Sequence, residues 1–140
     1  MKSYQLKILI KRTKPPVWRR CVIPSGITFS QLAVLLEEIM EETPSALFEF
    51  EFPRAGILLQ ERRKDEKLFR RWDYDYRCAS DAMTGSLLDS ESWFTFRICG
   101  MDDDLEYRVD VEKCLEEETL CPEIRKQKGD PQDRTWTDPD

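Results

Sequence analysis

The chain has 140 residues, of which 40% are hydrophobic and 36% charged, and its formal net charge is −6. This length fits one domain with a single core, and no stretch is apolar enough to span a membrane, so we expect a cytoplasmic protein without a membrane partner. Histidine is absent, which excludes Ser-His-Asp and Cys-His catalysis, histidine-ligated metals and a histidine general base.

Charge is distributed unevenly along the sequence. Residues 1–36 contain no Asp or Glu, whereas residues 101–118 contain nine acidic residues and two basic ones. Two such segments either meet each other in the fold or meet different partners outside it.

The five cysteines do not suggest a metal site or a disulfide framework. Their number is odd and none forms a C-x-x-C pair, which both kinds of site favour. We therefore predict reduced thiols, mostly buried, and no cofactor. The cysteines are Cys21, Cys78, Cys99, Cys114 and Cys121.

The first 24 residues predict an antiparallel hairpin. Apolar and polar residues alternate in "YQLKILIKR" (4–12), as in a half-buried strand. "VWRRCVI" (17–23) predicts a second strand, with Val17, Arg19, Cys21 and Ile23 on one face. Pro15 and Pro16 separate the two strands, because proline fixes φ and donates no ladder hydrogen bond.

A helix and a further strand follow. Thr28 and Gln31 match the S/T-x-x-E/Q capping box, and apolar residues then recur at helical spacing as far as Met40. Pro44 follows the end of this helix. "LFEFEF" (47–52) alternates strictly and predicts a strand with phenylalanines on one face.

The signal weakens between residues 53 and 88, where "ILLQ" (57–60) is a possible short strand. "SWFTFRIC" (92–99) and "LEYRVDVEKCL" (105–115) predict two more strands. After Glu118 the chain becomes polar and is expected to form an extended C-terminal segment or tail (119–140) beyond a domain of residues 1–118.

This order predicts an α+β fold. We expect a mixed sheet with an N-terminal β-hairpin and one main helix packed on it, in a β-grasp-like (ubiquitin-like) arrangement. The first strand and the strand at 105–115 would then be neighbours. Lys7 and Lys11 would face Glu106, Asp110 and Glu112, which explains the charge asymmetry structurally.

The hairpin sequence resembles the opening of the plasmid pRiA4b ORF-3-like family. That family has K-P-P-[IV]-W-R-R between two strands, and residues 14–20 read KPPVWRR. The resemblance extends through "TFSQLAVLLEEIM" (28–40), "LFEF" (47–50), "LEYRVDVE" (105–112) and "KGDPQD" (128–133). It implies a bacterial protein of undefined biochemistry that is associated with a plasmid or mobile element. Family histidines are missing here, with Tyr107 at one of their positions and Leu105 at that of a family tryptophan.

The hairpin is the first candidate site. Arginine binds phosphate bidentately and tryptophan can stack on a base, so nucleic acid or another partner could be contacted here. In the alternative, which we favour, Trp18 lies in the core and the arginines pair with acidic residues downstream. The residues are Lys14, Trp18, Arg19 and Arg20.

A second candidate is an aromatic and basic segment suited to a protein partner, since interfaces favour Tyr, Trp and Arg. Its alternative role is a lid over the sheet. The residues are Arg70, Arg71, Trp72, Tyr74, Tyr76 and Arg77.

A third, remote candidate is a loop of carboxylates that could bind a hard cation. Because EF-hand spacing is absent, we interpret it as a solvated loop and predict no metal. The residues are Asp102, Asp103, Asp104 and Glu106.

These observations predict a non-enzymatic protein-interaction module whose partner is another protein. The alternative is a nucleic-acid-binding protein that uses the basic N-terminal hairpin.

Overall fold

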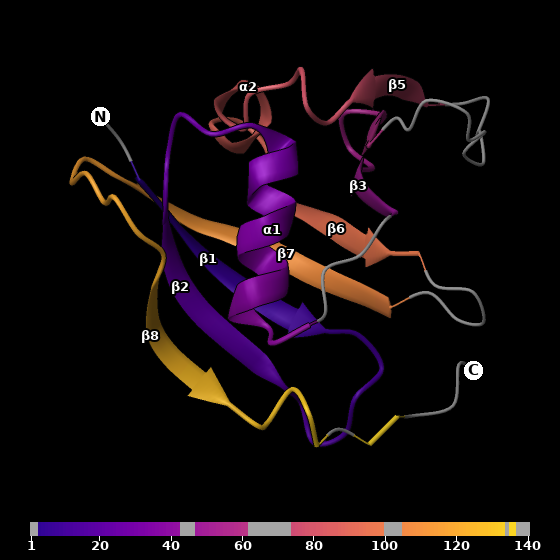
Figure 1. The fold of residues 1–140 in the computed structure, drawn as a ribbon, viewed down its shortest axis with the longest axis vertical. Coiled ribbons are helices and arrows are strands. Elements are labelled where there is room, and N and C mark those ends of the chain that lie inside the picture. The colour runs from indigo at the N-terminus through magenta and orange to yellow at the C-terminus, as the bar shows by residue number, and fades with distance from the viewer. Residues whose placement is uncertain (1–2, 43–46, 62–73, 100–104, 134, 137–140) are drawn as a thin grey trace.

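A computed structural model of the protein describes residues 3–42, 47–61, 74–99, 105–133 and 135–136. They form one eight-stranded sheet with helix α1 (Phe29–Ile39) lying across one of its faces, and with a short helix α2 (Gly85–Leu88) (Figure 1). The strands are β1 (Ser3–Ile10), β2 (Trp18–Pro24), β3 (Phe48–Phe52), β4 (Ile57–Gln60), β5 (Asp75–Cys78), β6 (Trp93–Ile98), β7 (Leu105–Leu115) and β8 (Glu123–Lys128).

The strand order is β5-β4-β3-β6-β7-β1-β2-β8. Strands β4 and β5 run parallel, and every other neighbouring pair is antiparallel. β1 forms the predicted hairpin with β2, and on its other side it pairs with β7 from Ser3 opposite Leu115 to Ile10 opposite Tyr107. The predicted adjacency of the first strand and the strand at 105–115 is therefore present.

The predicted β-grasp-like α+β fold is wrong. The described chain is mostly a mixed sheet of eight strands with two short helices, rather than an α+β domain built on one main helix. β5 and β8 extend the sheet at its two ends, and β8 lies in the segment after Glu118 that we expected to be extended or a tail. All six β8 residues are exposed, so no alternation of buried residues marks this strand in the sequence. Backbone pairing with β2 holds it in place.

The core lies between α1 and the sheet. Phe29 at the start of α1 packs edge-on against Phe50 and Phe52 of β3, with ring centroids 5.1 and 5.7 Å away. The helix starts as predicted, because the Thr28 hydroxyl accepts from the Gln31 amide at 3.2 Å and the Gln31 side chain accepts from the Thr28 amide at 2.9 Å. This capping starts the helix at Phe29 and so helps to hold its ring against β3.

Leu87 and Leu88 of α2 join the same buried cluster as α1 and the inward residues of the sheet. Neither described helix has the length and apolar character that crossing a membrane requires.

Candidate functional site

The face of the sheet opposite α1, here called the outer face, carries mostly polar side chains. Residues paired directly across a sheet share a face. Trp93 of β6 pairs with Asp110 of β7, Asp110 with Lys7 of β1, and Lys7 with Arg20 of β2. One row of polar and aromatic side chains therefore crosses four strands on this face.

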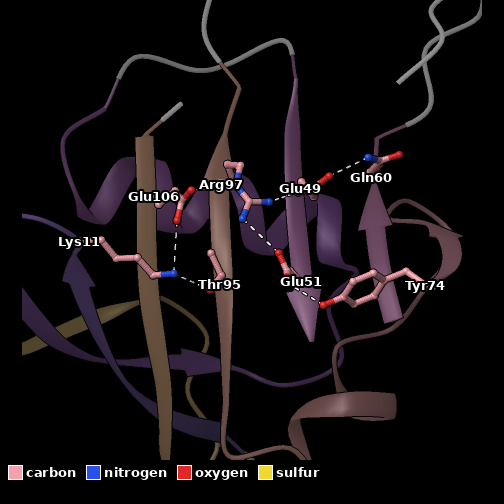
Figure 2. Close-up of polar contacts among 8 residues, drawn as sticks. All are labelled: Lys11, Glu49, Glu51, Gln60, Tyr74, Thr95, Arg97 and Glu106. Atoms are coloured by element: carbon pink, nitrogen blue, oxygen red, sulfur yellow. Dashed lines mark hydrogen bonds and ion pairs between the residues drawn. The ribbon is translucent and has the colours of Figure 1, made fainter. Parts of the chain in front are cut away.

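Arg97 of β6 is the centre of an ionic network on the outer face. Its Nη2 lies 3.1 Å from Glu51 Oε1, and its Nε lies 3.3 Å from Glu106 Oε1. Its Nη1 donates to Glu49 Oε2. Three carboxylates from β3 and β7, the two strands that flank β6, thus converge on one guanidinium group (Figure 2).

Four further side chains enclose this centre. Together they form what we call the Arg97 cluster (Figure 2): Lys11, Glu49, Glu51, Gln60, Tyr74, Thr95, Arg97 and Glu106. Lys11 Nζ donates to Thr95 Oγ1 at 2.9 Å and lies 3.4 Å from Glu106 Oε2. Tyr74 donates its hydroxyl to Glu51 at 2.8 Å, and Gln60 donates its amide to Glu49 at 2.8 Å.

The Arg97 cluster is unusually buried for an outward-facing surface. Glu49 is 7% exposed, Thr95 is 3% exposed, and the Arg97 side chain is 11% exposed. Burial lowers the pKa of Arg97, but the attraction of Glu49 and the contacts with Glu51 and Glu106 outweigh it, so the net pKa is raised. Burial raises the pKa of Glu106, but Arg97 and Lys11 outweigh it and the net pKa is lowered. Both groups therefore stay charged near neutral pH.

A second group on the outer face, here called the tryptophan–cation strip, consists of Lys7, Trp18, Arg20, Trp93 and Arg108. Lys7 Nζ lies 4.7 Å from the centre of the Trp18 ring, and Arg20 Cζ lies 5.3 Å from it. Arg108 Cζ lies 4.3 Å from the centre of the Trp93 ring. All five residues are half-buried. This strip joins two amphipathic aromatic side chains to three cations on neighbouring strands.

The strip is partly neutralised by acidic residues of β7. Arg20 holds Glu112 with two hydrogen bonds, at 2.7 and 3.0 Å, and these bonds lower the pKa of Glu112. Arg108 lies 3.2 Å from Asp110. The contacts of Lys11 with Glu106 and of Arg20 with Glu112 join the basic N-terminal segment to acidic β7, whereas Arg108 and Asp110 both belong to β7. The basic N-terminal part of the sequence and its acidic later part therefore contact each other within the fold.

The residues predicted in the hairpin are separated by the structure. Lys14 is exposed in the connection, and Trp18 and Arg20 lie on the outer face. Arg19 points to the opposite side, where it donates to the carbonyl of Ile39 at the end of α1 and to Glu41 at 2.8 Å. The prediction that Trp18 belongs to the core is wrong, since it is half-buried on the outer face.

The other predicted site residues are only partly described. Tyr74 belongs to the Arg97 cluster, Tyr76 pairs with Leu58 at the edge of the sheet, and Arg77 contacts Asp75 at 3.1 Å. Glu106 is engaged by Arg97 and Lys11. Among the residues that the structure describes, no group of three or more His, Cys, Asp or Glu side chains is suited to hold a metal ion. The predicted residues outside the described ranges are Arg70, Arg71, Trp72, Asp102, Asp103 and Asp104.

Sequence reasoning missed Arg97, Trp93 and Arg108 as members of a site. The alternation of β6 and β7 places all three on the polar face, so their direction was readable. Their partners could not be predicted from the sequence, because the order of the strands in the sheet decides which polar side chains meet.

Comparisons with known proteins agree with this fold. A solved structure, described as "Crystal Structure of Protein of Unknown Function MM3350 from Methanosarcina mazei Go1", matches with a TM-score of 0.68 and 23% sequence identity, over 90% of this chain and 68% of that chain. That likeness concerns the fold alone. No curated protein matches. The sequence model of one family matches residues 2–132. The protein therefore belongs to the family described as plasmid pRiA4b ORF-3-like protein.

Proposed function

We propose that the protein is a non-enzymatic protein-interaction module that binds its partner through the tryptophan–cation strip of the outer face. The observation that carries this proposal is the pairing of Trp18 and Trp93 with stacked cations on one half-buried surface. Trp and Arg are the side chains that most often dominate the energy of protein interfaces.

The position of this surface supports the proposal. α1 covers the other face of the sheet, so the strip lies on the side away from it (Figure 1). The stacked cations hold both indole rings in defined orientations, which lowers the entropy lost when a partner packs against them. A half-buried strip of aromatic and cationic side chains suits a protein surface.

The electrostatics of the Arg97 cluster support a binding role over a catalytic one. A general acid or base works best with a pKa close to the working pH. Glu106 has a lowered pKa and Arg97 a raised one, so neither exchanges a proton near neutral pH. The cluster acts as a rigid ionic support beside the strip.

The test is capture of partners from a cell extract by the immobilised protein, with quantitative comparison of variants. Trp18→Ala and Trp93→Ala should each weaken retention of a specific partner roughly thirtyfold, which corresponds to a hot-spot loss of about 2 kcal/mol. The matched control is Val34→Ser, at a residue of α1 that is 63% exposed. If both Trp variants retain the same proteins as the unchanged chain, the proposal is wrong. Thermal unfolding must first show that each variant is folded.

A second candidate is nucleic-acid binding, favoured by the row of cations formed by Lys7, Arg20 and Lys126 on three neighbouring strands. The contacts of Arg20 with Glu112 and of Arg108 with Asp110 weigh against it, because a phosphate would have to displace them. Binding measured at about 50 and 200 mM salt would separate the two candidates, since several phosphate contacts make affinity fall by orders of magnitude over this range.

A further inference from the structure

Strand β8 is the last strand on its side of the sheet, and its far edge meets no other strand in the described part of the chain. It pairs with β2 from Lys128 opposite Trp18 to Glu123 opposite Val22. Figure 1 shows it at the rim of the sheet beside β2. A strand paired on one side leaves alternate backbone N–H and C=O groups directed away from the sheet. Such groups can bind an added strand.

The edge is basic, although the whole chain is acidic. β8 has three cations and one anion, a net charge of +2, within a chain of net charge −6. Arg125 lies 3.5 Å from Glu123. Lys126 and Lys128 make no ion pair with any residue that the structure describes. The cationic side chains of this edge are therefore available to an anionic partner.

The outer face strengthens this positive field. Lys126 lies opposite Arg20, which lies opposite Lys7, so cations occupy one row on three neighbouring strands. Like charges directly opposite one another destabilise a sheet. Glu112 contacts Arg20 from β7 but lies on the side away from β8. An acidic side chain on a strand added beyond β8 would relieve the repulsion at Lys126.

The face of β8 on the α1 side of the sheet carries an apolar side chain instead of lysines. Ile124 lies opposite the core residue Cys21, so it belongs to the side of the sheet that carries α1, and it is 47% exposed. The register shifts between Arg20 and Cys21, so Ile124 and Lys126 lie on opposite faces although they are two positions apart. A strand added here would therefore meet Lys126 and Lys128 on one side and Ile124 and Gln127 on the other. Successive side chains of a strand point to opposite faces. The matching segment therefore alternates acidic and apolar residues.

We propose that the free edge of β8 binds an extended segment of a partner protein, in which acidic and apolar residues alternate, by strand addition. This inference rests on the proposed function and names the chemistry of the partner. A second copy of the chain is a poorer occupant, because two β8 edges of charge +2 repel each other. Backbone pairing supplies affinity, while Lys126 and Lys128 select the acidic partner.

The probe is a fluorescein-labelled peptide of alternating Glu and Val, compared with one of alternating Lys and Val. Binding is followed by fluorescence anisotropy at about 50 and 150 mM salt, and the β8 amides by hydrogen exchange. We expect the acidic peptide alone to bind and to slow exchange in β8. Lys126→Glu combined with Lys128→Glu should weaken it at least about tenfold.

The matched control combines Arg54→Glu with Lys113→Glu, which changes the net charge equally at exposed positions outside β8. It should leave peptide binding unchanged apart from a small general effect. Failure of the acidic peptide to bind, equal weakening by both double variants, or a concentration-dependent dimer that protects β8 would each overturn the inference. If the peptide fails while a partner is still captured through Trp18 and Trp93, strand addition is wrong and the proposed function stands.

Discussion

Removing the charge of Arg97 gives a direct test of the Arg97 cluster. Arg97→Met keeps a side chain of similar length, but it leaves Glu49, Glu51 and Glu106 without their shared cation. Removing one partner of a buried ion pair costs about 3–5 kcal/mol, because the remaining charge is uncompensated. The side chains of Arg97 and Glu49 are mostly buried, and that of Glu106 is 28% exposed. We therefore expect a loss of about 3–5 kcal/mol in the free energy of unfolding at pH 7.

The loss should also depend on pH. In the unchanged protein the pKa of Glu106 is lowered on folding, so its stabilisation is present above its unfolded value of about 4.3 and is lost as the pH falls through the folded value. In the variant, the three carboxylates face one another without a shared cation, and acidification relieves their mutual repulsion. The difference between the two proteins should therefore shrink from pH 7 to about pH 5.

Urea unfolding followed by tryptophan fluorescence measures both effects. The control is Arg108→Met, which removes a more exposed arginine of the same face and should cost less than about 1 kcal/mol at either pH. A loss below about 1 kcal/mol for Arg97→Met, or the same loss at both pH values, would refute the view that this cluster is a buried ionic support.

Three further predictions concern single positions. Gly129→Ala should destabilise the protein by about 1–3 kcal/mol in urea unfolding, because φ is +77° and the new Cβ would lie 2.9 Å from a methyl of Val17; unchanged stability would contradict the strained turn. Thr28→Ala should cost about 1 kcal/mol through loss of the helix cap, measured in the same way, and a neutral effect would mean that the cap is dispensable. Burial raises the pKa of the Cys21 thiol to about 12, so a thiol reagent at about pH 8 should label exposed Cys114 rapidly and Cys21 only after unfolding; rapid labelling of Cys21 in the native protein would show that β2 opens.

Local patterns in the sequence predict the central strands well. The alternation of Tyr4 to Ile10 and of Phe48 to Phe52 reflects strands with one side in the core, and the structure places both strands there. The capping box also marks the start of α1 in the sequence, because Thr28 and its hydrogen-bond partner Gln31 lie within one turn of helix. Such features depend on neighbours in the chain, so they are readable without the fold.

The edges and the ionic network could not be read in this way. The fully exposed strand Glu123–Lys128 carries no burial pattern, and its backbone pairing with β2 shows only in three dimensions. Arg97 meets Glu49 and Glu106 only because β6 lies between β3 and β7. The error in fold class has the same origin, since strands recruited at the edges enlarge a sheet without altering its central pattern.

The pairing of β1 with β7 has a consequence for how the chain is made. Leu6 pairs with Val111, so β1 leaves the ribosome long before its partner strand β7 is translated. Until β7 emerges, β1 has β2 as its one strand partner in the described sheet, and its edge toward β7 stays unpaired. Contacts between distant parts of a chain form slowly, and an unpaired strand is prone to aggregate in the meantime. The nascent protein is therefore expected to depend on chaperones until β7 emerges, and a shortened chain that ends before β7 should accumulate in inclusion bodies.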